Sequence, residues 1–256
     1  MKQLNEFNKL LIITLCSILI IYIFFSPINI VDENEVPSYN VELELEDTVK
    51  VFLEEIKKYK NTFNSNLDYI HPKFKVFNSK IDSNTTKQFV KVMMYYKLDS
   101  TEYKRKMYTG QILLESGAKQ YKHNGDLQLS YAGAVGLCQI MPNTCRGYFE
   151  KYISKKDSLE MMMLGASDFS FAYEDTLSIK EKNIRAKEWL SIVDNNIIMW
   201  GYITKKNLER KGDIHKQLIA YNMGTSGMNR FLSNGGDCLQ HKYICGIKNT
   251  LLVASK

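Results

Sequence analysis

Ile-Leu-Leu-Glu-Ser-Gly at residues 112–117 and Ser-Tyr-Ala-Gly-Ala-Val-Gly-Leu-Cys-Gln-Ile-Met-Pro at residues 130–142 are the two stretches that decide the fold of this 256-residue chain. The first stretch puts one carboxylate, Glu115, at the end of an apolar helix. Gly117 is a natural stop for that helix, because glycine readily adopts the left-handed backbone of a helix C-terminus. The second stretch has two glycines among small apolar residues, which predicts a short β-hairpin over 130–140. Pro142 suits the first turn of another helix.

Helical periodicity extends outward from these two stretches. We expect Asp99 or Ser100 to cap the helix that ends at Gly117. Residues 146–188 indicate additional helix and core, and two helices follow, the last of which begins near Asp213 and stops near Gly224. The predicted fold is therefore mainly α, with one small β element.

Upstream, apolar side chains recur at helical spacing over 49–63 and 89–96, separated by a polar stretch that contains His71-Pro72. Residues 27–46 mix prolines, asparagines and acids without a period, which is typical of a linker. The helices within 47–98 either form a small separate domain or pack on a domain that begins at Asp99. Both arrangements are compatible with the sequence.

The N-terminus predicts a membrane anchor. Residues 10–25 are almost wholly apolar, follow Lys2 and Lys9, and precede an acidic segment, a pattern that indicates a positive-inside export signal. Because small residues are missing at a plausible cleavage position, an uncleaved anchor at 10–26 is favoured over a removed signal peptide. This predicts a cytoplasmic N-terminus at 1–9, a single pass through the cytoplasmic (inner) membrane, and a domain on its periplasmic or outer side.

The chain carries a formal charge of +6 and has a pI near 8.8, which favours an anionic partner such as an acidic membrane or a bacterial cell wall. The basic residues are scattered and form no stripe with exposed aromatics, so we do not expect nucleic-acid binding. Four cysteines beyond the anchor suggest one or two disulfides of open pairing, at positions 138, 145, 238 and 245. With no Cys-x-x-Cys and dispersed histidines, neither a metal nor another cofactor is expected.

Glu115 is the candidate catalytic group. Cleavage of a glycosidic bond needs a proton for the leaving oxygen. Desolvation by apolar neighbours and the negative end of the helix dipole both disfavour an ionised Glu115, which raises its pKa toward the working pH of a general acid. Gln139 offers an amide that can donate and accept hydrogen bonds to a sugar, and the small residues Gly133, Ala134 and Gly136 let a polysaccharide approach the backbone. The alternative is a structural glutamate at a helix end beside a structural hairpin.

Four ordered blocks and a late pair, over roughly Asp99 to Ile247, resemble the soluble lytic transglycosylases, relatives of goose-type lysozyme. The blocks are Glu115-Ser116-Gly117, Gly133 to Pro142, Asp194-Asn195-Asn196-Ile197 with Gly201, and Ala220-Tyr221-Asn222-Met223-Gly224, and the late pair is Tyr243-Ile244. The resemblance implies an α+β lysozyme-like catalytic domain at 99–256. It also implies a substrate, the glycan strands of peptidoglycan, cleaved between N-acetylmuramic acid and N-acetylglucosamine.

In that family one glutamate acts as acid and then as base, the acetamido group of the substrate attacks the anomeric carbon, and a 1,6-anhydro sugar is released. The resemblance assigns the catalytic role to Glu115 and substrate contacts to Ser130, Gln139, Tyr221, Asn222 and Tyr243. Two alternatives stay open. One is a goose-type muramidase that hydrolyses the same bond, and the other is a catalytically silent wall-binding scaffold module of a secretion or phage apparatus, whose components the sequence does not identify.

Overall fold

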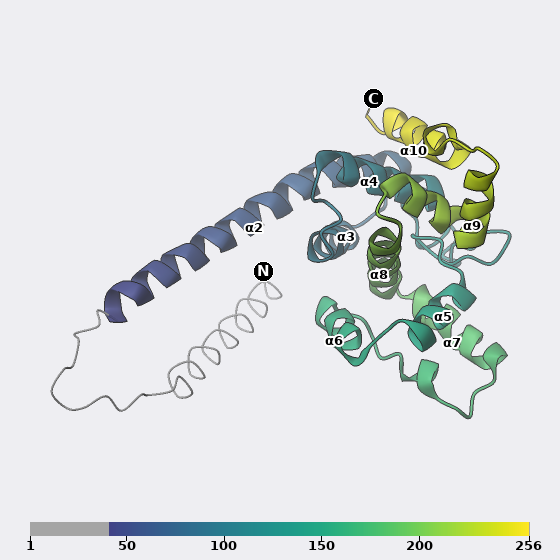
Figure 1. The fold of residues 1–256 in the computed structure, drawn as a ribbon, viewed down its shortest axis with the longest axis horizontal. Helices are drawn as coiled ribbons and strands as arrows, with labels where there is room; N and C mark the ends of the chain where they lie inside the picture. Colours follow the sequence, from purple (N-terminus) through teal and green to yellow (C-terminus); the bar gives the residue numbers. More distant parts are fainter. Residues whose placement is uncertain (1–40, 256) are drawn as a thin grey trace. The chain divides into compact units, whose positions relative to one another are not determined.

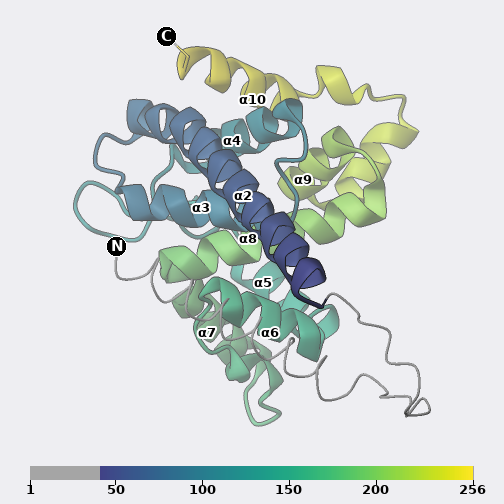
Figure 2. The ribbon, with the colours of Figure 1, turned by 90° about the vertical axis from the view of Figure 1, so that its left-hand side faces the viewer.

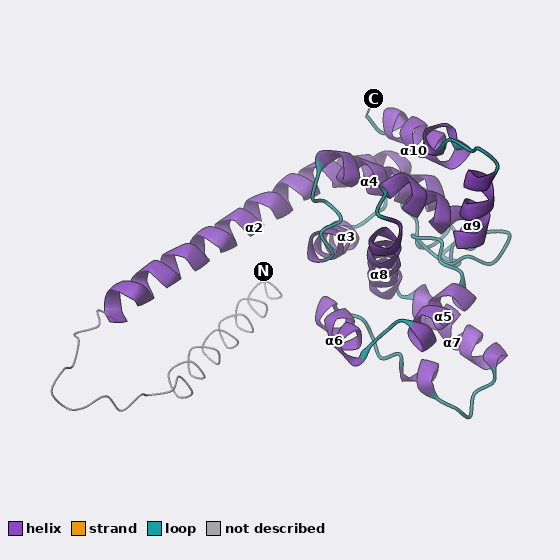
Figure 3. Ribbon diagram, viewed as in Figure 1, coloured by secondary structure: helices purple, strands orange, loops and turns teal. Residues whose placement is uncertain are grey.

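The computed structural model describes residues 41–255, with side chains from Val49 onward. The chain divides into two compact units, Met1–Glu54 and Glu55–Lys256. The described part is mainly helical, as predicted, and contains no strand (Figure 3). Its helices are α2 (Val41–Phe77), α3 (Ser83–Tyr95), α4 (Glu102–Ser116), α5 (Pro142–Lys151), α6 (Lys155–Leu164), α7 (Ile179–Ser191), α8 (Val193–Lys211), α9 (Ile214–Ser233) and α10 (Lys242–Val253), with short 3₁₀ turns η1 (Ser170–Tyr173) and η2 (Cys238–Gln240).

Helix α8 is the centre of the second unit, where it contacts α3, α7 and α9 (Figure 1). Its residues from Asn195 to Thr204 are all buried, so this helix is surrounded by other elements, as a helix that is apolar nearly all round must be. The Trp200 side chain is fully buried and stacks on Phe89 of α3 with ring centroids 4.8 Å apart. A single core therefore joins the early helices to the late ones.

The helices within 47–98 pack on the rest of the second unit rather than forming a separate domain. Ile70 and Phe74 of α2 and Phe89 of α3 are fully buried in the shared core. The expected linker over 27–46 is corrected at its end, because α2 already begins at Val41. Pro72 lies inside α2, where the sequence indicated an interruption. The buried Ile70 and Phe74 on either side supply the packing that offsets the hydrogen bond lost at proline.

The predicted helix ends near Glu115 are partly confirmed. Gly117 ends α4 with a left-handed backbone, φ 64°, and Pro142 lies in the first turn of α5. The α4 cap is Thr101 rather than Asp99 or Ser100, because its hydroxyl accepts a hydrogen bond from the Lys104 N–H. Residues 146–188 form helix and core, as expected.

The predicted β-hairpin over 130–140 is wrong in its form. Residues 117–141 make a long loop with three isolated antiparallel bridges, Tyr121 with Leu127, Leu129 with Val135, and Val135 with Ile140 (Figure 3). Buried side-chain amides, Gln120 of the loop itself and Asn196 of α8, bond to several backbone groups of this loop that a strand partner would otherwise pair. The glycine-rich composition therefore indicated a tight backbone path rather than a strand ladder.

Two further expectations are corrected. Gly224 has a non-helical backbone, φ 75° and ψ 161°, but helical structure resumes beyond it and α9 continues to Ser233. The four cysteines of the described region are free thiols, Cys138 and Cys145 fully buried and Cys238 and Cys245 partly buried, so they form no disulfide there. The predicted anchor at 10–26 lies outside the described residues. Within 41–255, no helix is both long and apolar enough to cross a membrane.

Candidate functional site

Glu115 meets Tyr243 across two helices that lie side by side. Glu115 is in the last turn of α4, and Tyr243 is in the first turn of α10, where its backbone N–H donates to the His241 ring at 3.2 Å. The Tyr243 hydroxyl donates a hydrogen bond to the Glu115 carboxylate. The pairing of α4 with α10 is visible in Figures 1 and 2. It joins two residues 128 positions apart in sequence.

Burial raises the pKa of Glu115 from its ordinary value of 4.5 to about 7, while the hydrogen bond from Tyr243 acts in the opposite direction by favouring the ionised form. Burial and the nearby Glu115 charge together raise the pKa of Tyr243 well above its usual range. Tyr243 thus keeps its proton. With a pKa of about 7, the protonated and ionised forms of Glu115 are similarly populated at neutral pH.

The loop beside Glu115 is held by hydroxyl groups at two consecutive carbonyls. The Ser116 hydroxyl donates to the Leu137 carbonyl at 2.7 Å, and the Tyr221 hydroxyl of α9 donates to the Cys138 carbonyl at 2.7 Å. The Glu115 charge contributes to the raised pKa of both the Cys138 thiol and the Tyr221 hydroxyl. Tyr221 is therefore close to the Glu115 carboxylate, and its bond fixes the loop at that place.

Two buried side-chain amides, those of Asn196 and Gln120, also hydrogen-bond to the backbone of this loop. Asn196 of α8 accepts from the Cys138 N–H at 2.8 Å and donates to the Val135 carbonyl at 2.9 Å. Gln120 accepts from the Leu137 N–H at 2.8 Å and donates to carbonyls at the end of α7. Because each amide pairs with backbone groups that would otherwise be buried and unbonded, these contacts fix the loop conformation.

Gly136 is required for packing rather than for ligand access. It is buried with φ 71°, and a Cβ at this position would lie 2.4 Å from the Gln120 side-chain oxygen. The space next to Gly136 is therefore filled by the protein itself, which corrects the expectation that a polysaccharide approaches here. Gly133 is different, since nothing lies within 4 Å of its Cβ position and it is partly exposed.

Gln139 has a left-handed backbone, φ 51°, which is unusual for a residue with a side chain. Its side-chain nitrogen donates to the Gly136 carbonyl at 2.7 Å, so the amide is oriented by the loop itself. The residue is partly exposed. Strained backbones of this kind cost about 1 kcal/mol or more and are concentrated at functional sites.

Ser130 and Asn222, two other predicted sugar contacts, make no hydrogen bond to Glu115 in the described part of the chain. The Ser130 hydroxyl accepts from the Ala134 N–H at 2.9 Å and closes a turn, and the residue is partly exposed. Asn222 is exposed, two residues before the break at Gly224. The structure therefore groups Tyr243, Tyr221 and the Cys138–Gln139 backbone around Glu115, and leaves these two residues available to solvent.

Sequence reasoning assigned no role to Ser116, Gln120 or Gln111. Ser116 lies in the block that identified Glu115, so its position was a usable signal. Gln111 lies one helical turn before Glu115 on the same face, which is a weaker signal of the same kind. Gln120 follows the helix in a loop, and nothing local indicates that its amide reaches the ends of α7 and the glycine-rich loop.

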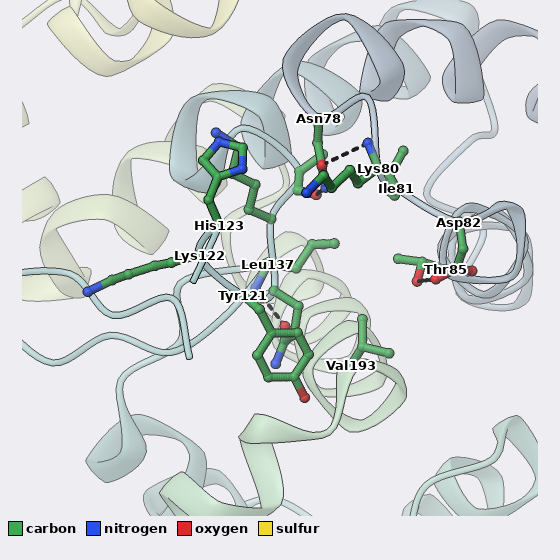
Figure 4. Close-up of a pocket in the computed structure, with 13 residues that line it drawn as sticks. Asn78, Lys80, Ile81, Asp82, Thr85, Tyr121, Lys122, His123, Leu137 and Val193 are labelled. Carbon is green, nitrogen blue, oxygen red and sulfur yellow. Dashed lines mark hydrogen bonds between the residues drawn. The ribbon is translucent and has the colours of Figure 1, made fainter. Parts of the chain in front are cut away.

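A pocket of about 270 Å³ lies between the α2–α3 turn and the loop after α4 (Figure 4). Four basic residues line it together with Asp82, whose carboxylate accepts from the Thr85 N–H as the α3 cap. Neither Glu115 nor Tyr243 is among its lining residues. We assign no role to it.

Comparison of the chain with known proteins gives no match among family models, curated proteins or solved structures.

Proposed function

We propose that this chain is a peptidoglycan lytic transglycosylase with a lysozyme-like catalytic domain, and that Glu115 is its acid and base. The observation that carries the proposal is one partly buried glutamate whose pKa is about 7 and which Tyr243 holds by a hydrogen bond. Four sequence blocks of the family and the late Tyr243-Ile244 pair support it, and Tyr243 of that pair hydrogen-bonds to this glutamate.

In the first step, protonated Glu115 transfers its proton to the glycosidic oxygen between N-acetylmuramic acid and N-acetylglucosamine. The bond from that oxygen to the anomeric carbon breaks, and the acetamido oxygen of the same muramoyl residue bonds to the carbon in its place. The leaving sugar departs with the proton as a hydroxyl group. Glu115 is then a carboxylate, and it accepts a hydrogen bond from the Tyr243 hydroxyl.

In the second step, Glu115 takes the proton from the muramoyl 6-hydroxyl. The oxygen of that hydroxyl then attacks the anomeric carbon. The bond to the acetamido oxygen breaks, a 1,6-anhydro ring closes, and Glu115 is protonated again. No water is consumed. A pKa of about 7 suits a group that must give up and regain one proton near neutral pH.

The surroundings of Glu115 favour substrate assistance over a second protein carboxylate. Within the described region, the causes that shift the pKa of Glu115 are burial and Tyr243, and no carboxylate is among them. Asp126 is exposed and accepts from the Asn124 amide at 2.7 Å within its own turn. Two-carboxylate glycosidases place their carboxyl groups about 5–10 Å apart, and such a pair would interact electrostatically.

The proposal includes a place and a partner. The basic charge and the N-terminal apolar segment support a single-pass protein of the cytoplasmic membrane that acts on glycan strands on the periplasmic or outer side. The proposed sugar contacts are the partly exposed Ser130 and the exposed Asn222, together with Gln139, Tyr221 and Tyr243.

The test is digestion of purified sacculi by the full-length protein, followed by mass spectrometry of the released fragments. We expect 1,6-anhydromuramoyl ends. Glu115→Gln should abolish release, because the amide has no proton of suitable acidity to transfer, whereas Glu209→Gln, an exposed position on α8, should retain it. Reducing ends without anhydro sugars would indicate a goose-type muramidase. Wall binding without any cleavage by the unaltered protein would instead indicate the silent scaffold module.

A further inference from the structure

The side-chain amide nitrogen of Gln111 is buried and has no hydrogen-bond partner in the described region. The residue is fully buried in α4, and its side-chain oxygen accepts a hydrogen bond from the Trp200 indole N–H at 3.2 Å. An indole nitrogen can only donate, so this contact fixes which end of the amide is oxygen. The other end is therefore the nitrogen, which carries two protons. A buried donor without a partner costs about 1–3 kcal/mol.

An acceptor with unused capacity on the same side of α4 belongs to Tyr243. Gln111 and Glu115 are four residues apart in α4, so both side chains are on one face, and Tyr243 approaches that face from α10. The Tyr243 hydroxyl has one proton, which it donates to Glu115, and its oxygen retains the capacity to accept. The Gln111 amide contributes to the Tyr243 pKa in the lowering direction, against the effect of burial, which is the direction expected for a donor beside that hydroxyl.

We infer that Gln111 is a positioning residue that acts on Glu115 through Tyr243, with its amide N–H donating to the Tyr243 hydroxyl oxygen. Trp200, Gln111, Tyr243 and Glu115 then form one chain in which every donor points toward the carboxylate. Each bond in such a chain polarises the next, so the Tyr243 hydroxyl becomes a stronger donor. The stronger hydrogen bond from Tyr243 stabilises the ionised form of Glu115 more than the protonated form. It therefore limits how far burial raises the Glu115 pKa.

The test measures the pKa of Glu115 directly in the full-length protein, by ¹³C NMR titration of labelled glutamate carboxyls, with Glu115→Gln to assign the signal. Tyr243→Phe removes the donor and should raise the Glu115 pKa by about 1, and Gln111→Met should raise it by about 0.5. Methionine is chosen because it keeps the length of glutamine without its polar atoms. In the double variant Gln111→Met/Tyr243→Phe, the shift should equal that of Tyr243→Phe alone.

The double variant separates positioning from a purely structural role. If Gln111→Met leaves the Glu115 pKa unchanged, or raises it equally when Tyr243 is already phenylalanine, the inference is wrong. Thr204→Val is the matched control, since Thr204 is a fully buried α8 residue whose hydroxyl also has no partner in the described region. It should leave the Glu115 pKa where it is.

If Gln111→Met does not fold, the unaltered protein supplies a second measurement. The side-chain ¹⁵N–H signals of Gln111 should titrate with the pKa of Glu115, and Tyr243→Phe should abolish that response. Absence of the response in the unaltered protein would overturn the inference. The catalytic consequence rests on the proposed function, but both readouts are independent of cleavage. If the chain does not cleave sacculi while the coupling is observed, only the proposed function fails.

Discussion

The folded protein favours the protonated form of Glu115 over the ionised form, because burial disfavours the charge. Its carboxyl has a pKa near 4.5 when solvated and about 7 when folded. Between these pH values the folded protein binds more protons than the unfolded chain, so the free energy of unfolding falls as pH rises through this window. The residue proposed to act as acid and base is therefore also a cost to stability at neutral pH.

Glu115→Gln should consequently stabilise the protein by an amount that grows as the pH rises from about 4.5 to 7 and is nearly constant above that. The amide cannot ionise, so at pH 8 the variant should exceed the unaltered protein in free energy of unfolding by up to about 3 kcal/mol, while at pH 4 the two should be similar. Urea denaturation at both pH values measures the difference. Equal stability at pH 8 would contradict the raised pKa, whatever the outcome of the cleavage assay.

The contact between α4 and α10 depends on Gly110, which precedes Glu115 in α4. A Cβ on Gly110 would lie 2.7 Å from Leu251 Cγ and 2.9 Å from Ile247 Cγ2, both in α10. The absence of a side chain lets the two helices approach closely. That approach carries Tyr243 to Glu115, so helix packing and site geometry are linked.

Gly110→Ala should therefore destabilise the protein by about 1–3 kcal/mol through overpacking, although alanine favours a helix by about 1 kcal/mol. Gly147→Ala is the matched control, because Gly147 also lies inside a helix, α5, with nothing within 4 Å of its Cβ position. That variant should gain about 0.5–1 kcal/mol. Thermal unfolding compares the two, and a gain in both would mean that α10 moves aside without cost.

The conformation of the loop over 117–141 could not be predicted from the local sequence pattern. Its glycines and small residues indicated tight backbone geometry, and the positive φ of Gly133 and Gly136 agrees. The hairpin prediction failed because the Gln120 and Asn196 side chains bond to the loop backbone. Gln120 is 17 residues from its partner Leu137, and Asn196 is 58 or more residues from Cys138 and Val135, so neither contact leaves a trace in local periodicity.

The core of the second unit begins well before the blocks that identified Glu115. Phe74 and Phe89 have ring centroids 5.3 Å apart, and Phe89 stacks on Trp200. The compact unit starts at Glu55, whereas the sequence blocks start near Asp99. Removal of α3 and the later part of α2 would expose one side of the central helix α8.

A fragment of residues 55–256 should therefore unfold cooperatively, and a fragment of residues 99–256 should not. The shorter fragment loses Phe89, which stacks on Trp200, and Phe74, which packs on Phe89, and full burial of such side chains contributes about 1.5–3 kcal/mol each. Near-ultraviolet circular dichroism and urea denaturation distinguish the two fragments. Cooperative unfolding of residues 99–256 alone would restore Asp99 as the start of an independent domain.

The sequence by itself determined the mainly helical class, the stop at Gly117 and the placement of one carboxylate at the end of an apolar helix, because periodicity, capping and glycine conformation are local properties. It also singled out Tyr243 and Tyr221 through their blocks. The tertiary structure alone decided that Tyr243 hydrogen-bonds to Glu115 and that buried side-chain amides take the place of a strand ladder. It also decided that the Gln111 side chain is buried and accepts a hydrogen bond from Trp200. Those outcomes depend on contacts between residues far apart in the chain, whose geometry is set by the packing of α4, α8, α9 and α10.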